Sequence, residues 1–297
     1  MIRRITWGSS NFKEDGGPFL RGKNERLLKI TLHNQSLTSA QEKELEALNA
    51  IIELAYLPEI AAVETEGKTF PFLEVGIQSE QSNFIPVSVI SPKKETKFSI
   101  SNPNQFLEFA KSLIHQNKNG DNDIQKIYRD LILIEAHRRL NQDLFITLSP
   151  ILLNNKSCSL LKNTNILTPL ETIKVLGLFL RSRDNYTIKG GLYGKYIIDR
   201  GSFYRILMRH RLNNMWRYFS ACVEADKMST DKLIYLGQSI LIRCARALEA
   251  RDSIGCQFYV PQSGSTRDIT MYHFDYLTLL LSGAIDAQAR IAHRVYK

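Results

Sequence analysis

RDITMYHFDYLTLLLSGAIDAQARIAHRVYK, residues 267–297, is the stretch from which we predict the architecture of the second half of the chain. It is long enough for about eight helical turns and contains no proline. At helical spacing its apolar side chains form one wide face, made of Phe274, Leu277, Leu280, Leu281, Ala284 and Ile285. We therefore expect a long helix that is buried at the centre of a helical bundle.

A polar line runs along the same predicted helix. At about 100° per residue, Asp275, Ser282, Asp286 and His293 lie close to one line. Burying carboxylates costs several kcal/mol unless they are paired or take part in chemistry. On a buried helix, this line must therefore meet partners, water or a substrate.

Two interpretations of the polar line stay open. In the first, its acids bind Arg243 and Arg246 of the preceding predicted helix and form a packing layer. In the second, Asp286, Arg290 and His293 face a cleft as catalytic residues. His293 would then act as acid or base, Arg290 would hold a phosphate, and Asp286 would orient either of them.

The composition is that of a globular protein. The chain has 297 residues, of which 43% are hydrophobic and 23% charged, and this length allows two domains of ordinary size. Its apolar runs are shorter than the roughly 20 residues that a bilayer requires, and the first residues form no apolar leader segment. We expect a cytoplasmic protein without a membrane partner.

The cysteine pattern points away from metal binding. The four cysteines lie far apart and form no Cys-x-x-Cys pair: Cys158, Cys222, Cys244 and Cys256. This spacing predicts reduced structural thiols rather than a disulfide framework or a zinc site. We expect no metal site and no cofactor.

The positive charge belongs to the second half of the chain. Residues 1–150 contain 18 of the 39 Lys and Arg and 19 of the 30 Asp and Glu, a net charge of −1. Residues 151–297 contain the other 21 against 11, a net charge of +10. Such an asymmetry indicates a polyanionic partner on one face, with nucleic acid the first candidate and an anionic membrane surface the second.

The first half predicts an α/β domain with a small sheet over residues 1–153. Short β-branched or aromatic segments predict strands at 26–32, 60–64, 70–78, 84–90 and 143–147. Helices are expected at 103–115 and 124–140, and another after Thr38 and Gln41, which have the spacing of a capping box. The polar run 154–165 is the predicted domain boundary.

The second half predicts a basic, all-helical domain over residues 166–297. Thr168, Pro169 and Glu171 combine a cap, a proline and a box glutamate, and they predict a helix start. Further helices are expected from about 202, at about 230–252 and at 267–297. The fold class is therefore an α/β domain followed by a helical bundle.

Cations and aromatic residues alternate near the start of this basic domain. The expected nucleic-acid-binding residues are Arg181, Arg183, Lys189, Lys195, Arg200, Arg209, Arg211 and Arg217, together with Arg267 before the terminal helix. Tyr186, Tyr204 and Trp216 lie among them, and a surface that mixes cations with aromatic faces suits single strands or RNA loops. The alternative is a solvated helix face whose aromatic residues belong to the core.

An arginine–histidine spacing adds a possible cleavage chemistry. Arg205 precedes His210 by five positions, and Arg267 precedes His273 by six. In a basic helical domain this spacing resembles HEPN-type ribonucleases, over about residues 168–297. The resemblance implies RNA cleavage without metal, in which Arg205 stabilises phosphate charge and His210 positions or activates the ribose 2′-OH.

The first half carries a second resemblance. Residues 130–149, DLILIEAHRRLNQDLFITLS, resemble the closing helix and strand of PIN-like nucleases, in which the strand ends in Thr-x-Asp. Ser149 takes the place of that acid, and no strand near the N-terminus ends in Asp followed by Thr or Ser and then Asn. Because Mg²⁺ or Mn²⁺ needs two or three convergent carboxylates, the resemblance implies a structural or degenerate PIN-like domain.

Together these patterns predict a nucleic-acid-handling protein, with RNA favoured over DNA. Both resemblances imply a ribonuclease of the kind found in toxin or phage-defence modules. The alternative is a non-catalytic adaptor that binds nucleic acid or a partner protein through the basic face, and a homo-oligomer is compatible with either. Both depend on the cations gathering on one exposed concave surface beside Asp286 and His293.

Overall fold

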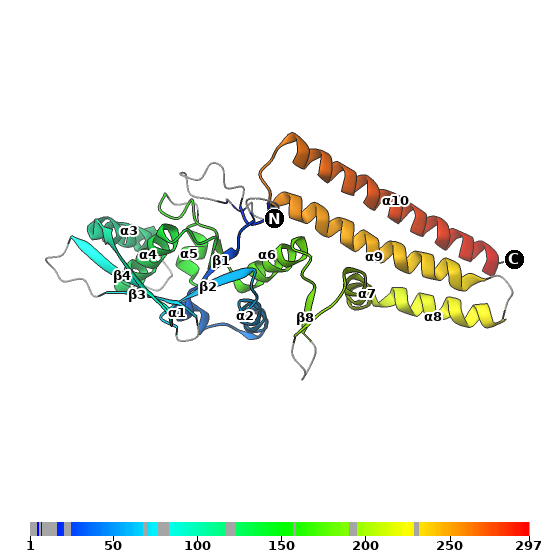
Figure 1. The fold of residues 1–297 in the computed structure, drawn as a ribbon, viewed down its shortest axis with the longest axis horizontal. Helices are drawn as coiled ribbons and strands as arrows, with labels where there is room; N and C mark the ends of the chain where they lie inside the picture. Colours follow the sequence, from blue (N-terminus) through cyan, green and yellow to red (C-terminus); the bar gives the residue numbers. More distant parts are fainter. Residues whose placement is uncertain are drawn as a thin grey trace. The chain divides into compact units, whose positions relative to one another are not determined.

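The computed structural model describes residues 5, 7, 17–20, 25–67, 70–76, 83–116, 123–156, 159–189, 195–228 and 232–296. The chain divides into two compact units, Met1–Gly177 and Leu178–Lys297. We call them the sheet unit and the helical unit (Figure 1). The predicted fold class, α and β elements followed by a helical region, is confirmed.

The sheet unit is built on a seven-stranded mixed sheet in the order β5-β4-β3-β2-β1-β6-β7. The strands are β1 (Leu28–Leu32), β2 (Ile60–Thr65), β3 (Phe72–Val75), β4 (Phe84–Ile90), β5 (Glu95–Ser101), β6 (Leu144–Ile146) and β7 (Ile166–Leu167). β1 pairs in parallel with β2 on one side and with β6 on the other. The chain therefore changes direction across the sheet at β1, and ligands of α/β proteins bind outside the carboxyl ends of strands at such a point.

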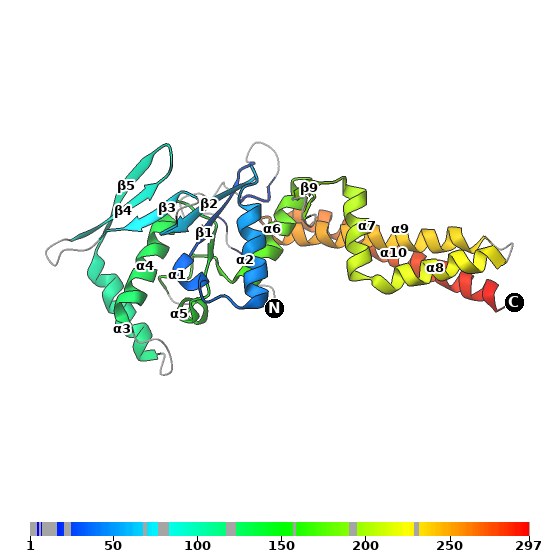
Figure 2. The ribbon, with the colours of Figure 1, turned by 90° about the horizontal axis from the view of Figure 1, so that it is seen from below.

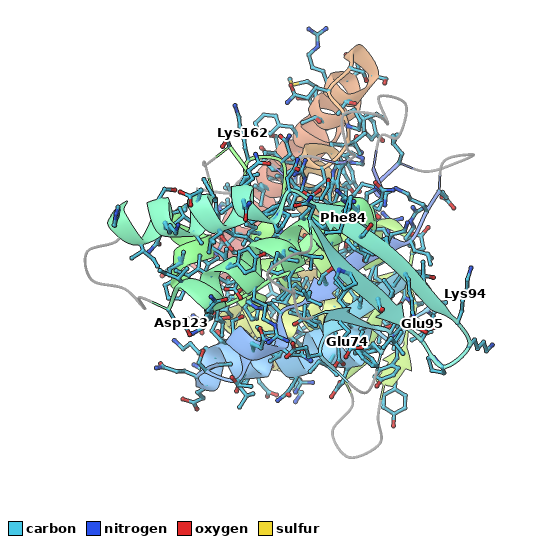
Figure 3. The ribbon with its side chains drawn as sticks, turned by 90° about the vertical axis from the view of Figure 1, so that its left-hand side faces the viewer. Glu74, Phe84, Lys94, Glu95, Asp123 and Lys162 are labelled. Carbon is cyan, nitrogen blue, oxygen red and sulfur yellow. The ribbon has the colours of Figure 1, made fainter. Side chains whose placement is uncertain are left out.

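β4 and β5 form an antiparallel hairpin at one side of the sheet. In Figure 3, Lys94 and Glu95 lie at the turn end of this hairpin and Phe84 at the other end. Charged side chains on an outer strand discourage pairing with another chain, because they would have to give up water at the new contact.

Six helices of the described chain begin in the sheet unit: α1 (Asn34–Leu37), α2 (Glu42–Leu54), α3 (Pro103–Gln116), α4 (Ile124–Arg139), α5 (Pro150–Asn154) and α6 (Pro169–Ser182). α3 and α4 lie side by side (Figure 2), and the apolar face predicted for α4 is buried in the core. Asp123 caps α4 by accepting from the backbone N–H of Gln125 and Lys126.

The two predicted capping boxes have opposite outcomes. The box at Thr168 is confirmed, since the backbone N–H of Thr168 donates to Glu171 Oε2 over 2.9 Å and that of Glu171 donates to Thr168 Oγ1 over 3.2 Å. The box at Thr38 is wrong. Thr38 follows the short helix α1, and Gln41 precedes α2 without a side-chain cap.

The division between the units falls later than the predicted boundary at 154–165. Residues 166 and 167 form β7, which pairs in parallel with β6 and completes the sheet. The sheet unit continues beyond β7 to Gly177, which lies inside α6.

The helical unit contains α7 (Arg200–Arg211), α8 (Asn213–Met228), α9 (Leu233–Phe258) and α10 (Gly264–Val295), with a small hairpin of β8 (Thr187–Lys189) and β9 (Lys195–Ile197). α9 contacts α7, α8 and α10 and is the central helix. The expectation that the terminal helix is the buried centre is wrong. Of α10, only Thr266, Leu280, Ala287 and Ile291 are buried.

None of the described helices combines the length and the apolar character that a membrane crossing needs. The three described cysteines, Cys222, Cys244 and Cys256, are free thiols. Cys158 lies outside the described residues.

Candidate functional site

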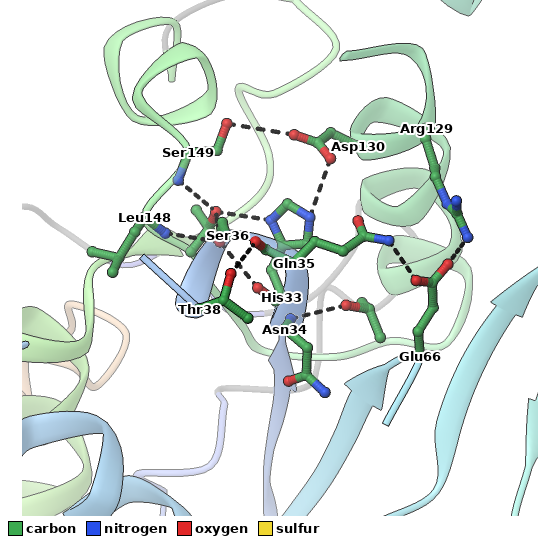
Figure 4. A network of polar contacts seen from close by, with 12 residues as sticks. His33, Asn34, Gln35, Ser36, Thr38, Glu66, Arg129, Asp130, Leu148 and Ser149 are labelled. Carbon is green, nitrogen blue, oxygen red and sulfur yellow. Dashed lines mark hydrogen bonds and ion pairs between the residues drawn. The ribbon is translucent and has the colours of Figure 1, made fainter. Parts of the chain in front are cut away.

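A buried polar network lies where β1 and β6 end (Figure 4). His33 directly follows β1, and Thr147 directly follows β6. Because the two strands are parallel neighbours, their carboxyl ends meet at one edge of the sheet. His33 Nδ1 lies 2.9 Å from Thr147 Oγ1, and His33 Nε2 lies 3.1 Å from Asp130 Oδ1 on α4. Ser149 Oγ donates to Asp130 Oδ2 over 3.4 Å.

This network has the residue order of a nucleophile, a base and an orienting acid, but its hydroxyl is not free to react. Thr147 has no exposed surface, and its Oγ1 already accepts from the backbone N–H of Ser149 over 3.0 Å. Ser36 Oγ lies 2.9 Å from the same atom. A catalytic nucleophile must reach its substrate. We therefore assign this network a structural role, joining β1, β6 and α4.

The residues of this network also show whether the metal ion that a PIN-like fold implies could bind here. His33, Thr147 and Ser149, which follow β1 and β6, carry no carboxylate, so Asp130 is the one acid in direct contact with His33 and Ser149. Within the described parts of the chain, no three His, Cys, Asp or Glu lie close enough together to hold a metal ion. Since Mg²⁺ needs convergent oxygen ligands, the residues present do not fit it.

The sequence interpretation missed His33. Functional side chains gather at the carboxyl end of a central parallel strand. The position of His33 directly after the predicted strand 26–32 was therefore the signal that could have identified it. Asp130 and His137 share a face of a charged helix, a pattern typical of a solvated surface, yet both are buried. Their helix α4 lies against the sheet on that side.

His137 is a second buried histidine. Its Nδ1 lies 2.9 Å from Thr31 Oγ1, and its ring forms a T-shaped pair with that of Phe145. Burial, together with the charge of neighbouring Arg138, lowers the pKa of His137 to about 3. The imidazole is therefore neutral at ordinary pH and acts as part of the core.

The helical unit has a cavity of about 440 Å³ between α7, α8 and α9. Its apolar lining includes Tyr204, Met208, Trp216, Phe219 and Leu241, and its polar lining includes Arg205, Gln238, Arg246 and Glu249. The volume is within the range of pockets that hold small ligands, about 300–1,000 Å³. Trp216 Nε1 is buried, and no described residue accepts its hydrogen bond.

Exposed arginines lie at this cavity and elsewhere on the helices that form it. Arg205 and Arg246 line it, while Arg209 on α7 lies over the Trp216 ring, 5.9 Å from its centroid. Arg211 and Arg217 are exposed on α7 and α8. Among the described residues, none of these five arginines has a carboxylate within ion-pair distance, so their charge is available to an anion.

Other predicted nucleic-acid-binding residues pair within the helical unit. Arg181 Nε lies 2.7 Å from the buried carboxylate of Asp252, and Arg200 pairs with Glu249. Arg267 lies inside α10 rather than in a loop, with Nε 3.8 Å from Asp268. Internal pairs reduce the charge that these residues offer to a phosphate.

Three further predicted residues lie near the start of the helical unit. Arg183 lies over the ring of Phe179, 5.5 Å from its centroid. Lys189 and Lys195 face each other in the β8–β9 register, and their side chains are outside the described residues. The connecting residues 190–194 are outside them as well.

The structure does not bring the two predicted catalytic sets together. Arg205 lines the cavity, whereas His210 is exposed on the same helix without lining it. Asp286 and Arg290 form an exposed pair over 3.0 Å on α10, and His293 is exposed beyond them. Both views show α7 away from the carboxyl end of α10 (Figures 1 and 2). The polar line thus faces solvent and not a cleft shared with Arg205.

Comparison with known proteins gave no match to a family model, a curated protein or a solved structure. The geometry of the two units is therefore the basis on which a function is proposed.

Proposed function

We propose that this is a cytoplasmic protein whose helical unit binds single-stranded nucleic acid, RNA in preference to DNA, at the cavity between α7, α8 and α9. The observation that carries the proposal is an aromatic cavity lined by Arg205 and Arg246, with Arg209 over the Trp216 ring. Arg211 and Arg217 are exposed on the same two helices, α7 and α8. We call these five arginines the arginine rim.

Each part of the arginine rim and cavity suits one part of a nucleotide. Guanidinium groups bind phosphates and release condensed counterions, which favours binding at low salt. An apolar cavity beside Trp216 offers an unstacked base a ring to contact, and such stacking contributes about 1–3 kcal/mol per base. A hydrogen-bond acceptor on the base would also accept from Trp216 Nε1. Burying such a donor without a partner costs about 1–3 kcal/mol.

Binding is better supported than cleavage. A general acid or base must lie about 3 Å from the proton that it transfers. His210 lies five residues from Arg205 on α7, which is about 140° around the helix. Cleavage by Arg205 with His210, or by Asp286, Arg290 and His293, stays a prediction, and the non-catalytic adaptor is the form of the proposal that we favour.

The test measures binding of a fluorescent single-stranded RNA of mixed sequence, and of the matching DNA, by anisotropy over a range of salt. Arg205→Gln should weaken binding and reduce the slope of log K against log salt by about 0.7, the value for one phosphate contact on a single strand. Trp216→Leu should weaken binding about 5- to 150-fold, which corresponds to one lost stack.

Lys227→Gln is the matched control. It removes one positive charge from α8, but this lysine pairs with Glu224 near the other end of the helix. Its binding curve should overlay that of the unmodified protein. Equal losses in the Arg205, Trp216 and Lys227 variants would reduce the proposal to nonspecific charge attraction, and no RNA binding at low salt would remove it. An acidic protein partner would then be the remaining use of the arginine rim.

The same RNA serves to test cleavage. If the helical unit cuts RNA, products should form in the presence of EDTA, and His210→Ala or His293→Ala should abolish them. Undiminished cleavage by both variants would exclude the predicted catalytic residues. Intact RNA under conditions of saturating binding would support the adaptor.

We also propose that the sheet unit is a degenerate PIN-like domain. Supporting this are the central position of β1 between β2 and β6 and the placement of His33, Asp130 and Ser149 at one edge of the sheet. Replacing His33 and Ser149 together by Asp should create a site that binds Mn²⁺, measured by calorimetry. Asp130→Asn in that background should abolish the gain. A folded variant without Mn²⁺ binding would contradict the proposal.

A further inference from the structure

α10 carries a line of exposed residues with alternating spacings of three and four. The line consists of Met271, Phe274, Thr278, Leu281, Ile285, Gln288, Ala292 and Val295, and we call it the heptad face. Its five large apolar members are each between 47% and 66% exposed. A three-four spacing keeps side chains on one side of a helix that pairs with another helix.

The helix that α10 already contacts does not cover this line. Leu280, Ala287 and Ile291 are the α10 side chains buried in this stretch, and Ala287 and Ile291 share a core cluster with residues of α8 and α9. These three lie about 120° around the helix from the centre of the heptad face. α10 therefore has two apolar faces, one packed against α9 and one open.

The open face is long. From Met271 to Val295 it runs along 24 helical steps, which is about 36 Å. Contiguous apolar surface of this kind on a soluble protein usually marks an interaction site, since exposing it to water is unfavourable. A helix of similar length and spacing is the surface that fits it.

We propose that a second copy of this chain occupies the heptad face, with its α10 running antiparallel. A two-fold axis beside Gly283 pairs position i with position 566 − i. Met271 then faces Val295, and Leu281 faces Ile285. Phe274 faces the small Ala292, and Thr278 faces Gln288, so that large meets small and polar meets polar.

The sizes of the side chains on the heptad face favour the antiparallel direction. In a parallel pair Phe274 would face Phe274 and Ala292 would face Ala292, so the large rings would crowd one another and the small side chains would leave a gap. In the antiparallel pair each Phe274 faces an Ala292.

The first experiment is sedimentation or light scattering of the full chain over a range of concentration. We expect a species of twice the chain mass that dissociates on dilution. Leu281→Glu with Ile285→Glu should shift the protein to the monomer, with helical circular dichroism unchanged. Leu279→Glu is the matched control, because this leucine is exposed on α10 outside the heptad face. A monomer at all concentrations overturns the inference, as does equal loss of the dimer in the control.

The second experiment fixes the direction by cysteine cross-linking. Met271→Cys and Val295→Cys lie together across an antiparallel pair, so the double variant should form an intermolecular disulfide that neither single variant forms. Two copies of residue 271 would be about 36 Å apart in that arrangement. Cross-linking of each single variant would show a parallel pair and overturn the proposed direction. The unmodified chain reports the background from Cys158, Cys222, Cys244 and Cys256. The inference does not depend on RNA binding, and failure of one leaves the other standing.

Discussion

Acidification should destabilise the sheet unit through His137. The folded pKa of about 3 is below the ordinary value of 6.5, so the unfolded chain binds a proton that the folded chain refuses. The stability that depends on the neutral ring is fully present above pH 6.5, and it is lost progressively as the pH falls from 6.5 towards 3. At pH 5, which is about 1.5 units below the pKa of the unfolded chain, the free energy of unfolding has fallen by about 2 kcal/mol.

The variant that isolates this effect removes both hydrogen-bonding partners. His137→Leu alone would leave Thr31 Oγ1 buried without a partner, at a cost of about 1–3 kcal/mol. His137→Leu with Thr31→Val replaces the pair by apolar groups of similar shape. Between pH 7 and pH 5, we expect the free energy of unfolding to fall by about 2 kcal/mol less in this double variant than in the unmodified protein.

Hydrogen exchange measured by mass spectrometry reads the effect in the sheet unit alone. Peptides from α4 and β6 report the opening free energy at each pH, after correction for the intrinsic exchange rate. Peptides from α9 in the helical unit serve as an internal reference. If the unmodified protein and the double variant lose the same free energy between pH 7 and pH 5, the reasoning is refuted, and His137 is not the group that titrates.

Two further predictions concern the helical unit. Asp252→Ala leaves Arg181 without its buried carboxylate and should lower the free energy of unfolding by about 3–5 kcal/mol in thermal denaturation. Asp268→Ala, at an exposed ion pair, should change it by less than about 0.5 kcal/mol. Similar effects of the two variants would show that burial of the ion pair is unimportant. In Gly255→Ala, on α9, the added Cβ would lie at an ordinary 3.4 Å from its nearest neighbour, so the free energy of unfolding in urea should rise by about 0.5–1 kcal/mol. In Gly237→Ala the added Cβ would lie 3.1 Å from side chains of α8, so the same gain should not appear. Equal gains would contradict the close approach of α8 and α9.

Local sequence signals located most of the elements because their causes are local. Thr168, Pro169 and Glu171 cap a helix through contacts within one turn, and the structure has that cap. The periodicity of α4 and the strand that follows it were predicted for the same reason. Thr38 and Gln41 carried a similar pattern but failed, because Thr38 is the C-cap of the short helix α1 and Gln41 is the N-cap position of α2.

Properties that depend on distant neighbours could not be read in the same way. Periodicity showed that α10 has a wide apolar face, yet it could not show which part of that face α9 covers, and the predicted central helix proved to be an outer one. His33 and Thr147 are 114 positions apart and meet only because β1 and β6 pair in parallel. By itself the sequence determined where the longer helices and the central strands form and which half carries the charge, since both follow from neighbouring residues. The tertiary structure decided which arginines are paired, which histidines are buried and which face of α10 stays open, because each of these requires contacts between segments far apart in the chain.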